Sequence, residues 1–324
     1  FLKGVERAFP SMHWIRGVGK NYEGLIKVEL ARAETDRVKK TALLKSAVSD
    51  MEAGLEHCKK WIISRPTPSY LAVVAGFEDG FGGILNELHS LTEDRETLTK
   101  AIEVYEDAAE RFRKANLPSR AAESYWKMAR NQDCLGDRQR AAENFENAQA
   151  QYKAAAEKIP HFSAFYLDYA LYMEAWSEIE RARFTHEREK YTEAMKHYEN
   201  VASLLKSSKL WGYLSSNFLA WSLLEKAEDL SRKEHNVESI NAFKRAAELF
   251  EKTKGTLEEE IGKIKNPDEN QKATQLCEAS IIRKDYCLAR VNVEEARKYD
   301  LEGNHVESAE KYDLAASSFE KMSE

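Results

Sequence analysis

The chain repeats one helical pattern five times. Each copy has a small residue, an aromatic residue four positions later, another small residue three further on, and a large apolar residue four beyond that. Steps of four, three and four keep all members on one face of an α-helix, where alternating small and large side chains let a partner helix approach closely. The copies are Ala101-Tyr105-Ala108-Phe112, Ala141-Phe145-Ala148-Tyr152, Ala194-Tyr198-Val201-Leu205, Ser239-Phe243-Ala246-Phe250 and Ser308-Tyr312-Ala315-Phe319.

Four of these patterns follow a short turn, and each turn follows another helix. Gly136 stands five residues before the second copy and Gly303 five residues before the fifth, where a glycine ends a helix in a left-handed cap. In the third and fourth copies Glu189 and Glu234 take the place of the glycine. Seven residues before each turn lies an alanine, which we expect to be buried where the two helices of a pair cross: Ala129, Ala182, Ala227 and Ala296.

These units resemble the tetratricopeptide repeat over roughly residues 82–324. The resemblance is carried by Ala129, Gly136, Ala141, Phe145 and Ala148 in one unit, and by Ala296, Tyr299, Gly303, Ser308, Tyr312 and Ala315 in the last. The spacings of 40, 53, 45 and 69 residues between copies depart from that motif's period of about 34. Such long, uneven units are more similar to the tetratricopeptide-like group that includes the soluble NSF attachment proteins. The resemblance implies an all-α fold, a right-handed superhelix of antiparallel helix pairs (an α-solenoid).

Composition favours helix throughout the 324 residues, with only 14 glycines and 6 prolines. We expect an N-terminal helical segment over residues 1–92, packing on a repeat array over residues 93–324. Residues 21–64 predict one or two long helices with Gly54 as a break. The glycine-rich stretch 76–83 predicts a tight bend or close helix packing, since acidic Glu78 and Asp79 would repel a phosphate. Because the chain begins at Phe1, we expect a piece of a longer protein.

Charge and cysteine content limit the classes of function. The 49 basic and 55 acidic residues are interspersed and give a net charge of −6, which argues against a nucleic-acid groove. No apolar run reaches the length of a membrane span. Four scattered cysteines, without a C-x-x-C pair, predict buried thiols and a cytoplasmic protein.

The sequence offers no convincing catalytic or metal constellation. His57 and Cys58 are adjacent and therefore do not face each other on a helix, and no H-E-x-x-H motif is present. The remaining histidines stand alone. We therefore expect no enzyme activity, no metal and no cofactor.

A binding surface can be predicted from the resemblance, which implies that the first helix of each pair lines a concave face. Arginine and tryptophan commonly anchor interfaces, and we expect the arginines to be exposed. The tryptophans are equally consistent with core between repeats. The candidate residues are Trp126, Lys127, Arg130, Trp176, Arg183, Trp221, Arg290 and Arg297.

The sequence thus predicts a non-enzymatic scaffold or adaptor that binds a protein or peptide, as the sensor or adaptor region of a larger protein. A basic stripe on a chain of negative net charge would suit an acidic partner. The alternative is a membrane-proximal adaptor, similar to soluble NSF attachment proteins, in which apolar and basic side chains of residues 1–20 contact lipid.

Overall fold

A computed structural model describes residues 11–265 and 267–323. The described residues form twelve α-helices and two short 3-10 turns, with no strand among them. The helices are α2 (Ser11–Ala33), α3 (Arg37–Ser64), α4 (Pro68–Thr92), α5 (Arg95–Lys114), α6 (Pro118–Leu135), α7 (Arg138–Lys158), α8 (Ser163–His186), α9 (Tyr191–Ser207), α10 (Ser215–Arg232), α11 (Asn236–Ile261), α12 (Pro267–Leu301) and α13 (His305–Ser323). The predicted all-α class is confirmed for this part of the chain.

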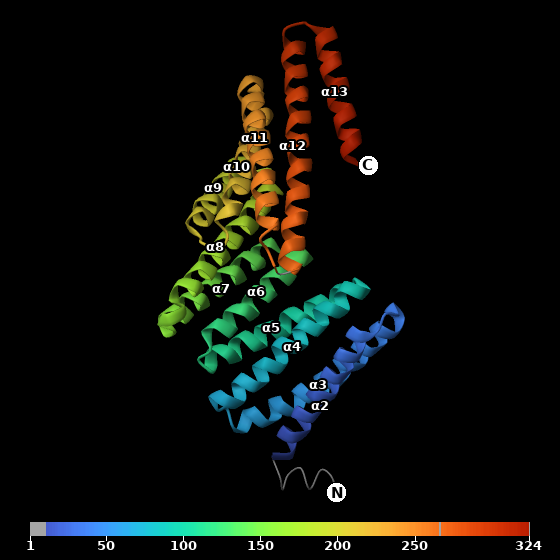
Figure 1. Cartoon of the computed structure of the whole chain (residues 1–324), viewed down its shortest axis with the longest axis vertical. Coiled ribbons are helices and arrows are strands. Elements are labelled where there is room, and N and C mark those ends of the chain that lie inside the picture. Colours follow the sequence, from blue (N-terminus) through green and yellow to red (C-terminus); the bar gives the residue numbers. More distant parts are fainter. Residues whose placement is uncertain (1–10, 266, 324) are drawn as a thin grey trace. The chain divides into compact units, whose positions relative to one another are not determined.

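Helices adjacent in sequence pack against one another as antiparallel pairs (Figure 1). Contacts group the chain into two compact units, residues 1–173 and 174–324, which divide within α8. The sequential pairing agrees with the predicted helical repeat. The handedness of the superhelix and the boundary after residue 92 stay predictions.

The turns between helices adopt the predicted left-handed conformation. Gly136 has a φ of 82° and Gly303 a φ of 76°. Glu189 and Glu234, which replace the glycine, have φ values of 57° and 60°. The backbone geometry of the turn is therefore kept where the sequence lacks glycine. Side chains with a Cβ pay a steric cost in this conformation.

The four packing alanines are confirmed as buried, each with no exposed surface. In unit 174–324 the second helix of a pair is tied to the alanine of the first. Ser239 Oγ donates to the Ala227 carbonyl oxygen at 3.0 Å, and Ser308 Oγ donates to the Ala296 carbonyl oxygen at 3.0 Å. The serine that opens the fourth and the fifth pattern thus contacts the alanine of the preceding helix.

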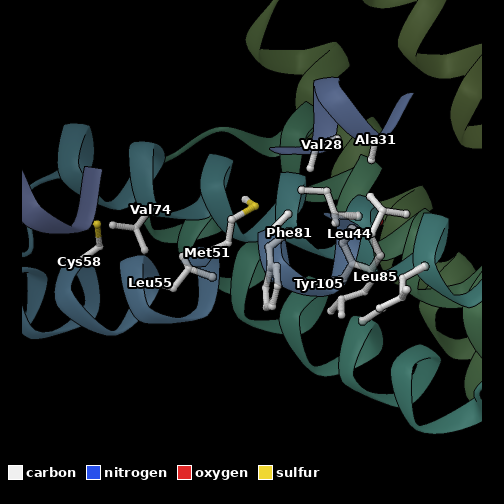
Figure 2. Close-up of a cluster of buried hydrophobic side chains, with 14 of the residues drawn as sticks. Val28, Ala31, Leu44, Met51, Leu55, Cys58, Val74, Phe81, Leu85 and Tyr105 are labelled. Atoms are coloured by element: carbon white, nitrogen blue, oxygen red, sulfur yellow. The ribbon is translucent and has the colours of Figure 1, made fainter. Parts of the chain in front are cut away.

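One core cluster of unit 1–173 is formed mainly by α2, α3, α4 and α5 (Figure 2). Its helices approach closely at glycines. A Cβ on Gly54 would lie 2.9 Å from the Gly17 carbonyl oxygen and 2.6 Å from Asn21 Nδ2. The labelled core residues are Val28, Ala31, Leu44, Met51, Leu55, Cys58, Val74, Phe81, Leu85 and Tyr105.

The prediction of a break at Gly54 is wrong. Gly54 lies inside α3, and the chain instead breaks at residues 34–36. Asp36 caps α3, since its side chain accepts from the backbone N–H groups of Val38 and Lys39. Gly54 is needed for the close contact between α2 and α3, so its role is in packing and not in ending a helix.

The glycine-rich stretch 76–83 lies within α4 and shows close helix packing, not a bend. A Cβ on Gly82 would lie 2.6 Å from the ring of Tyr105 in α5. The two acids of the stretch are paired with cations from neighbouring helices. Glu78 accepts from Arg111 at 2.8 Å, and Asp79 accepts from Lys127 at 2.7 Å.

The prediction of buried thiols holds for three cysteines. Cys58, Cys277 and Cys287 are buried, whereas Cys134 is exposed near the end of α6. Cys134 lies two residues before the left-handed Gly136, where α6 ends. Its place at a helix end, away from the packed stripe, explains the exposure.

Candidate functional site

In unit 174–324 the first helices of successive pairs, α8, α10 and α12, are linked by charged side chains. His186 of α8 lies 2.9 Å from a carboxylate oxygen of Glu225 in α10. Their contact raises the pKa of His186, and burial raises the pKa of Glu225. One turn further along α10, Glu228 accepts from Arg290 at 2.8 Å and from Tyr286 Oη at 2.8 Å, both in α12.

A second polar cluster lies beside this contact. The hydroxyl of Ser231 in α10 accepts from Arg290 at 2.8 Å and from Arg297 at 3.1 Å, and it contacts the buried carboxylate of Glu294 at 2.7 Å. Arg290 also lies over the ring of Phe243 at 5.0 Å. Residues 290–297 of α12 are therefore held by side chains of α10 and α11.

Because of these contacts, the predicted arginines of this unit differ in how exposed their side chains are. The Arg290 side chain is only 17% exposed because it pairs with the half-buried Glu228. The expectation of an exposed arginine is therefore wrong at this position. Arg183 is 40% exposed and pairs with Glu180, and Arg297 is 45% exposed and pairs with Glu294. Arg183 and Arg297 retain accessible surface that a partner could contact.

A cavity of about 470 Å³ lies among α10, α12 and α13, next to the end of α8. Arg283 of α12 lies over the ring of Trp221 at 4.6 Å. Trp221 is stacked on Tyr198 of α9 and meets Phe250 of α11 edge-on. The cavity also has an apolar wall made by Leu224, Ile282, Phe319 and Met322.

A second hollow of about 610 Å³ lies near the turns of the same unit, and Glu228 lines both. Its lining is mostly charged or polar. Arg297, predicted as a binding residue, takes part in it. The other charged lining residues are Glu189, Glu228, Arg232, Glu234 and Asp300.

The three predicted residues of α6 belong to the other unit. Trp126 meets the rings of Tyr169 and Tyr172 edge-on, at 6.2 Å each. Lys127 is bound to Asp79, and Arg130 is exposed. The predicted set therefore does not form one site within a single unit.

One of the three tryptophans combines both interpretations left open by the sequence. Trp126, Trp176 and Trp221 are all half-buried. One side of Trp221 packs against the core of its unit while the residue also lines the cavity. Trp221 is thus both a core residue and a candidate binding residue.

Arg283 is the residue that sequence reasoning missed. It lies seven positions before Arg290 in α12, which places the two on the same helical face. That spacing was the available signal. The prediction named Arg290 and Arg297, the two arginines nearest to the packing alanine Ala296. It did not extend the seven-residue spacing to Arg283.

Scans against protein-family models and searches of curated proteins gave no match to this chain. Within residues 11–265 and 267–323, no helix is long and apolar enough to cross a bilayer. The same residues contain no group of three histidine, cysteine or acidic side chains placed to hold a metal ion.

Proposed function

We propose that the chain is a right-handed tetratricopeptide-like scaffold that binds a protein or peptide through the first helices of its pairs. The observation that carries this proposal is the pair of hollows in unit 174–324 that share Glu228. Together they present half-exposed arginines, aromatic rings and an apolar wall. The half-exposed arginines suit acidic residues of a peptide, and the rings and the apolar wall suit its apolar residues.

Peptide display on the purified chain tests the proposal. Random 12-residue peptides are selected, and their affinities for the parent are compared with those for the Arg232→Glu, Arg297→Glu double variant, because both arginines line the larger hollow. We expect enriched peptides to carry Asp or Glu beside apolar residues, and their affinity to fall in the double variant and at high salt. The matched control is Arg245→Glu, an exposed residue of α11 that pairs with Glu248. Failure to enrich any peptide, or equal binding by parent and double variant, would count against the proposal.

The membrane-proximal alternative rests on a different surface. Residues 1–10 lie outside the described residues, but Ile15, Tyr22, Ile26 and Leu30 form an exposed apolar stripe on α2. Trp14, by contrast, packs edge-on against Tyr70 at 4.8 Å. Co-sedimentation with liposomes, compared between parent and Ile15→Ser, Ile26→Ser, tests this alternative. Loss of lipid binding in the variant would support it, and no binding by the parent would exclude it.

A further inference from the structure

The apolar stripe on the exposed face of α2 contains a glycine. Ile15, Tyr22 and Ile26 are each more than half exposed. With Gly19 they follow steps of four, three and four residues, which keep all four on one face of the helix. The ring of Tyr22 lies edge-on to Phe77 of α4 at 6.2 Å, and this contact positions it. The stripe therefore presents a positioned aromatic ring to solvent beside a glycine.

The three glycines of α2 differ in what packs against them. Glycine inside a helix lowers helix stability relative to alanine, and close packing is a common reason to keep it. A Cβ on Gly17 would meet Cys58 of α3, and a Cβ on Gly24 would meet Met51 of α3. A Cβ on Gly19 would meet no atom within 4 Å. Within residues 11–265 and 267–323, no other helix explains this glycine.

A glycine on a helix can seat an aromatic ring of a neighbouring helix. Helices α4 and α5 show this arrangement, because a Cβ on Gly82 would lie 2.6 Å from the ring of Tyr105. The stripe on α2 offers both parts, an open glycine and an exposed tyrosine three residues later. Two antiparallel copies of α2 can therefore each seat the tyrosine of the other on their own glycine.

We propose that the chain forms a two-fold symmetric dimer through antiparallel packing of α2 on the α2 of a second copy. In this register Gly19 faces the partner's Tyr22, and Ile15 faces the partner's Ile26. The symmetry axis repeats both pairs, so that one surface complements itself. The stripe belongs to unit 1–173 and the two hollows to unit 174–324, so dimerisation and peptide binding can be tested separately.

Charged residues beside the stripe favour the antiparallel direction. Arg16 and Glu23 are seven residues apart, so they lie on the same side of the stripe. The two-fold axis brings Arg16 near the partner's Glu23, and it brings Glu23 near the partner's Arg16. Opposite charges thus meet twice at the edge of the interface.

Sedimentation equilibrium of the purified chain between about 1 and 200 μM tests the proposal. We expect a monomer–dimer equilibrium with a dissociation constant on the order of 10 μM, because one helix pair buries less surface than a standard interface. Species larger than a dimer, or a chain that stays monomeric over this range, would overturn the proposal.

Gly19→Leu separates specific packing from general apolar adhesion. Leucine favours helix more than glycine does, so the chain should keep its circular dichroism spectrum. The added side chain fills the space needed by the partner's Tyr22 and should weaken the dimer by about tenfold or more. General adhesion or lipid binding should instead increase, because the variant adds apolar surface. The control Ile63→Ser removes an exposed apolar side chain of α3 outside the stripe and should leave the dimer intact.

Charge exchange tests the direction of the two helices. Arg16→Glu places like charges opposite each other and should weaken the dimer by about threefold. Adding Glu23→Arg to this variant restores opposite charges across the axis and should recover the parent affinity. Failure of this recovery would exclude the antiparallel register.

Two further results would also overturn the proposal. One is a Gly19→Leu variant that associates as tightly as the parent, and the other is loss of association in Ile63→Ser. If the parent stays monomeric while Gly19→Leu binds liposomes more tightly than the parent does, lipid and not a second copy covers the stripe.

Discussion

The hydroxyl of Ser239 in α11 donates a 3.0 Å hydrogen bond to the carbonyl oxygen of Ala227 in α10. Ser308 and Ala296 repeat this contact in the next pair, again twelve residues apart and at 3.0 Å. Both alanines have no exposed surface. The repeated contact shows how a small residue on each helix allows the two backbones of a pair to approach.

Enlarging Ala227 should therefore disrupt the pair. We expect Ala227→Leu to lower the free energy of unfolding by about 1–3 kcal/mol, because added methyl groups must displace well-packed atoms. Urea denaturation followed by circular dichroism measures the change. Ala150→Leu on the exposed side of α7 is the control and should have little effect. Equal stability of the two variants would contradict the packing described for Ala227.

Replacing Gly19 of α2 and Gly54 of α3 by alanine should change the free energy of unfolding in opposite directions. Gly54→Ala places a Cβ 2.9 Å from a backbone carbonyl oxygen and should destabilise the chain by about 1–3 kcal/mol. Gly19→Ala in α2 meets no atom within 4 Å and should stabilise by up to about 1 kcal/mol, since alanine favours helix. The shifts in urea midpoint measure both effects. Shifts of the same sign would refute the assignment of Gly54 as the contact point of α2 and α3.

Glycine at the left-handed turns should stabilise the fold relative to a residue with a Cβ. Glu234 has a φ of 60°, and we expect Glu234→Gly to raise the free energy of unfolding by about 0.5–1 kcal/mol through relief of the steric cost. The reciprocal change, Gly136→Ala at a φ of 82°, should cost about 1 kcal/mol. Thermal melts of both variants check this prediction, and a lower Tm for Glu234→Gly would show that the side chain stabilises the turn.

Glu78 should make stability depend on pH. Burial raises the pKa of Glu78 from 4.5 to about 7, against the opposing charges of Arg111 and Lys59. The folded chain therefore holds a proton that the unfolded chain releases, and stability falls as the pH rises from 4.5 through 7. Relative to Glu78→Gln, which cannot ionise, the parent should lose about 3 kcal/mol between pH 4 and pH 8. Urea titrations at each pH give this difference, and parallel curves for parent and variant would refute it.

Cys134 should react before the other three thiols. Burial raises the pKa of Cys58 to about 11 and that of Cys287 to about 12, and Cys277 is buried as well. Since the thiolate is the reactive form, a thiol reagent at pH 8 should titrate one cysteine rapidly in the folded chain. Unfolding should release all four. Cys134→Ser should abolish the rapid phase, and persistence of that phase would show that another thiol is accessible.

The sequence alone determined the elements that depend on local chemistry. The five repeated patterns predicted helices, the buried alanines and the left-handed turns at Gly136 and Gly303, whereas the positive φ of Glu189 and Glu234 came from the structure. Periodicity on one helical face and the conformation of a short turn are set by residues close in sequence, so they can be predicted without a structure. For residues 76–83 the sequence left a tight bend and close helix packing open, and Tyr105 of α5 decides for packing.

The tertiary structure decided which residues are held by partners distant in sequence. Arg283 and Arg290 share a face of α12, but only Arg290 meets the carboxylate of Glu228, which lies 62 residues away in sequence. Likewise, Gly54 is a contact point because Gly17 and Asn21 of α2 lie against it. Helical spacing gives the face on which a side chain lies. Whether that face meets an acid, a ring or a cavity depends on the neighbouring helix, and only the packed fold brings that neighbour into place.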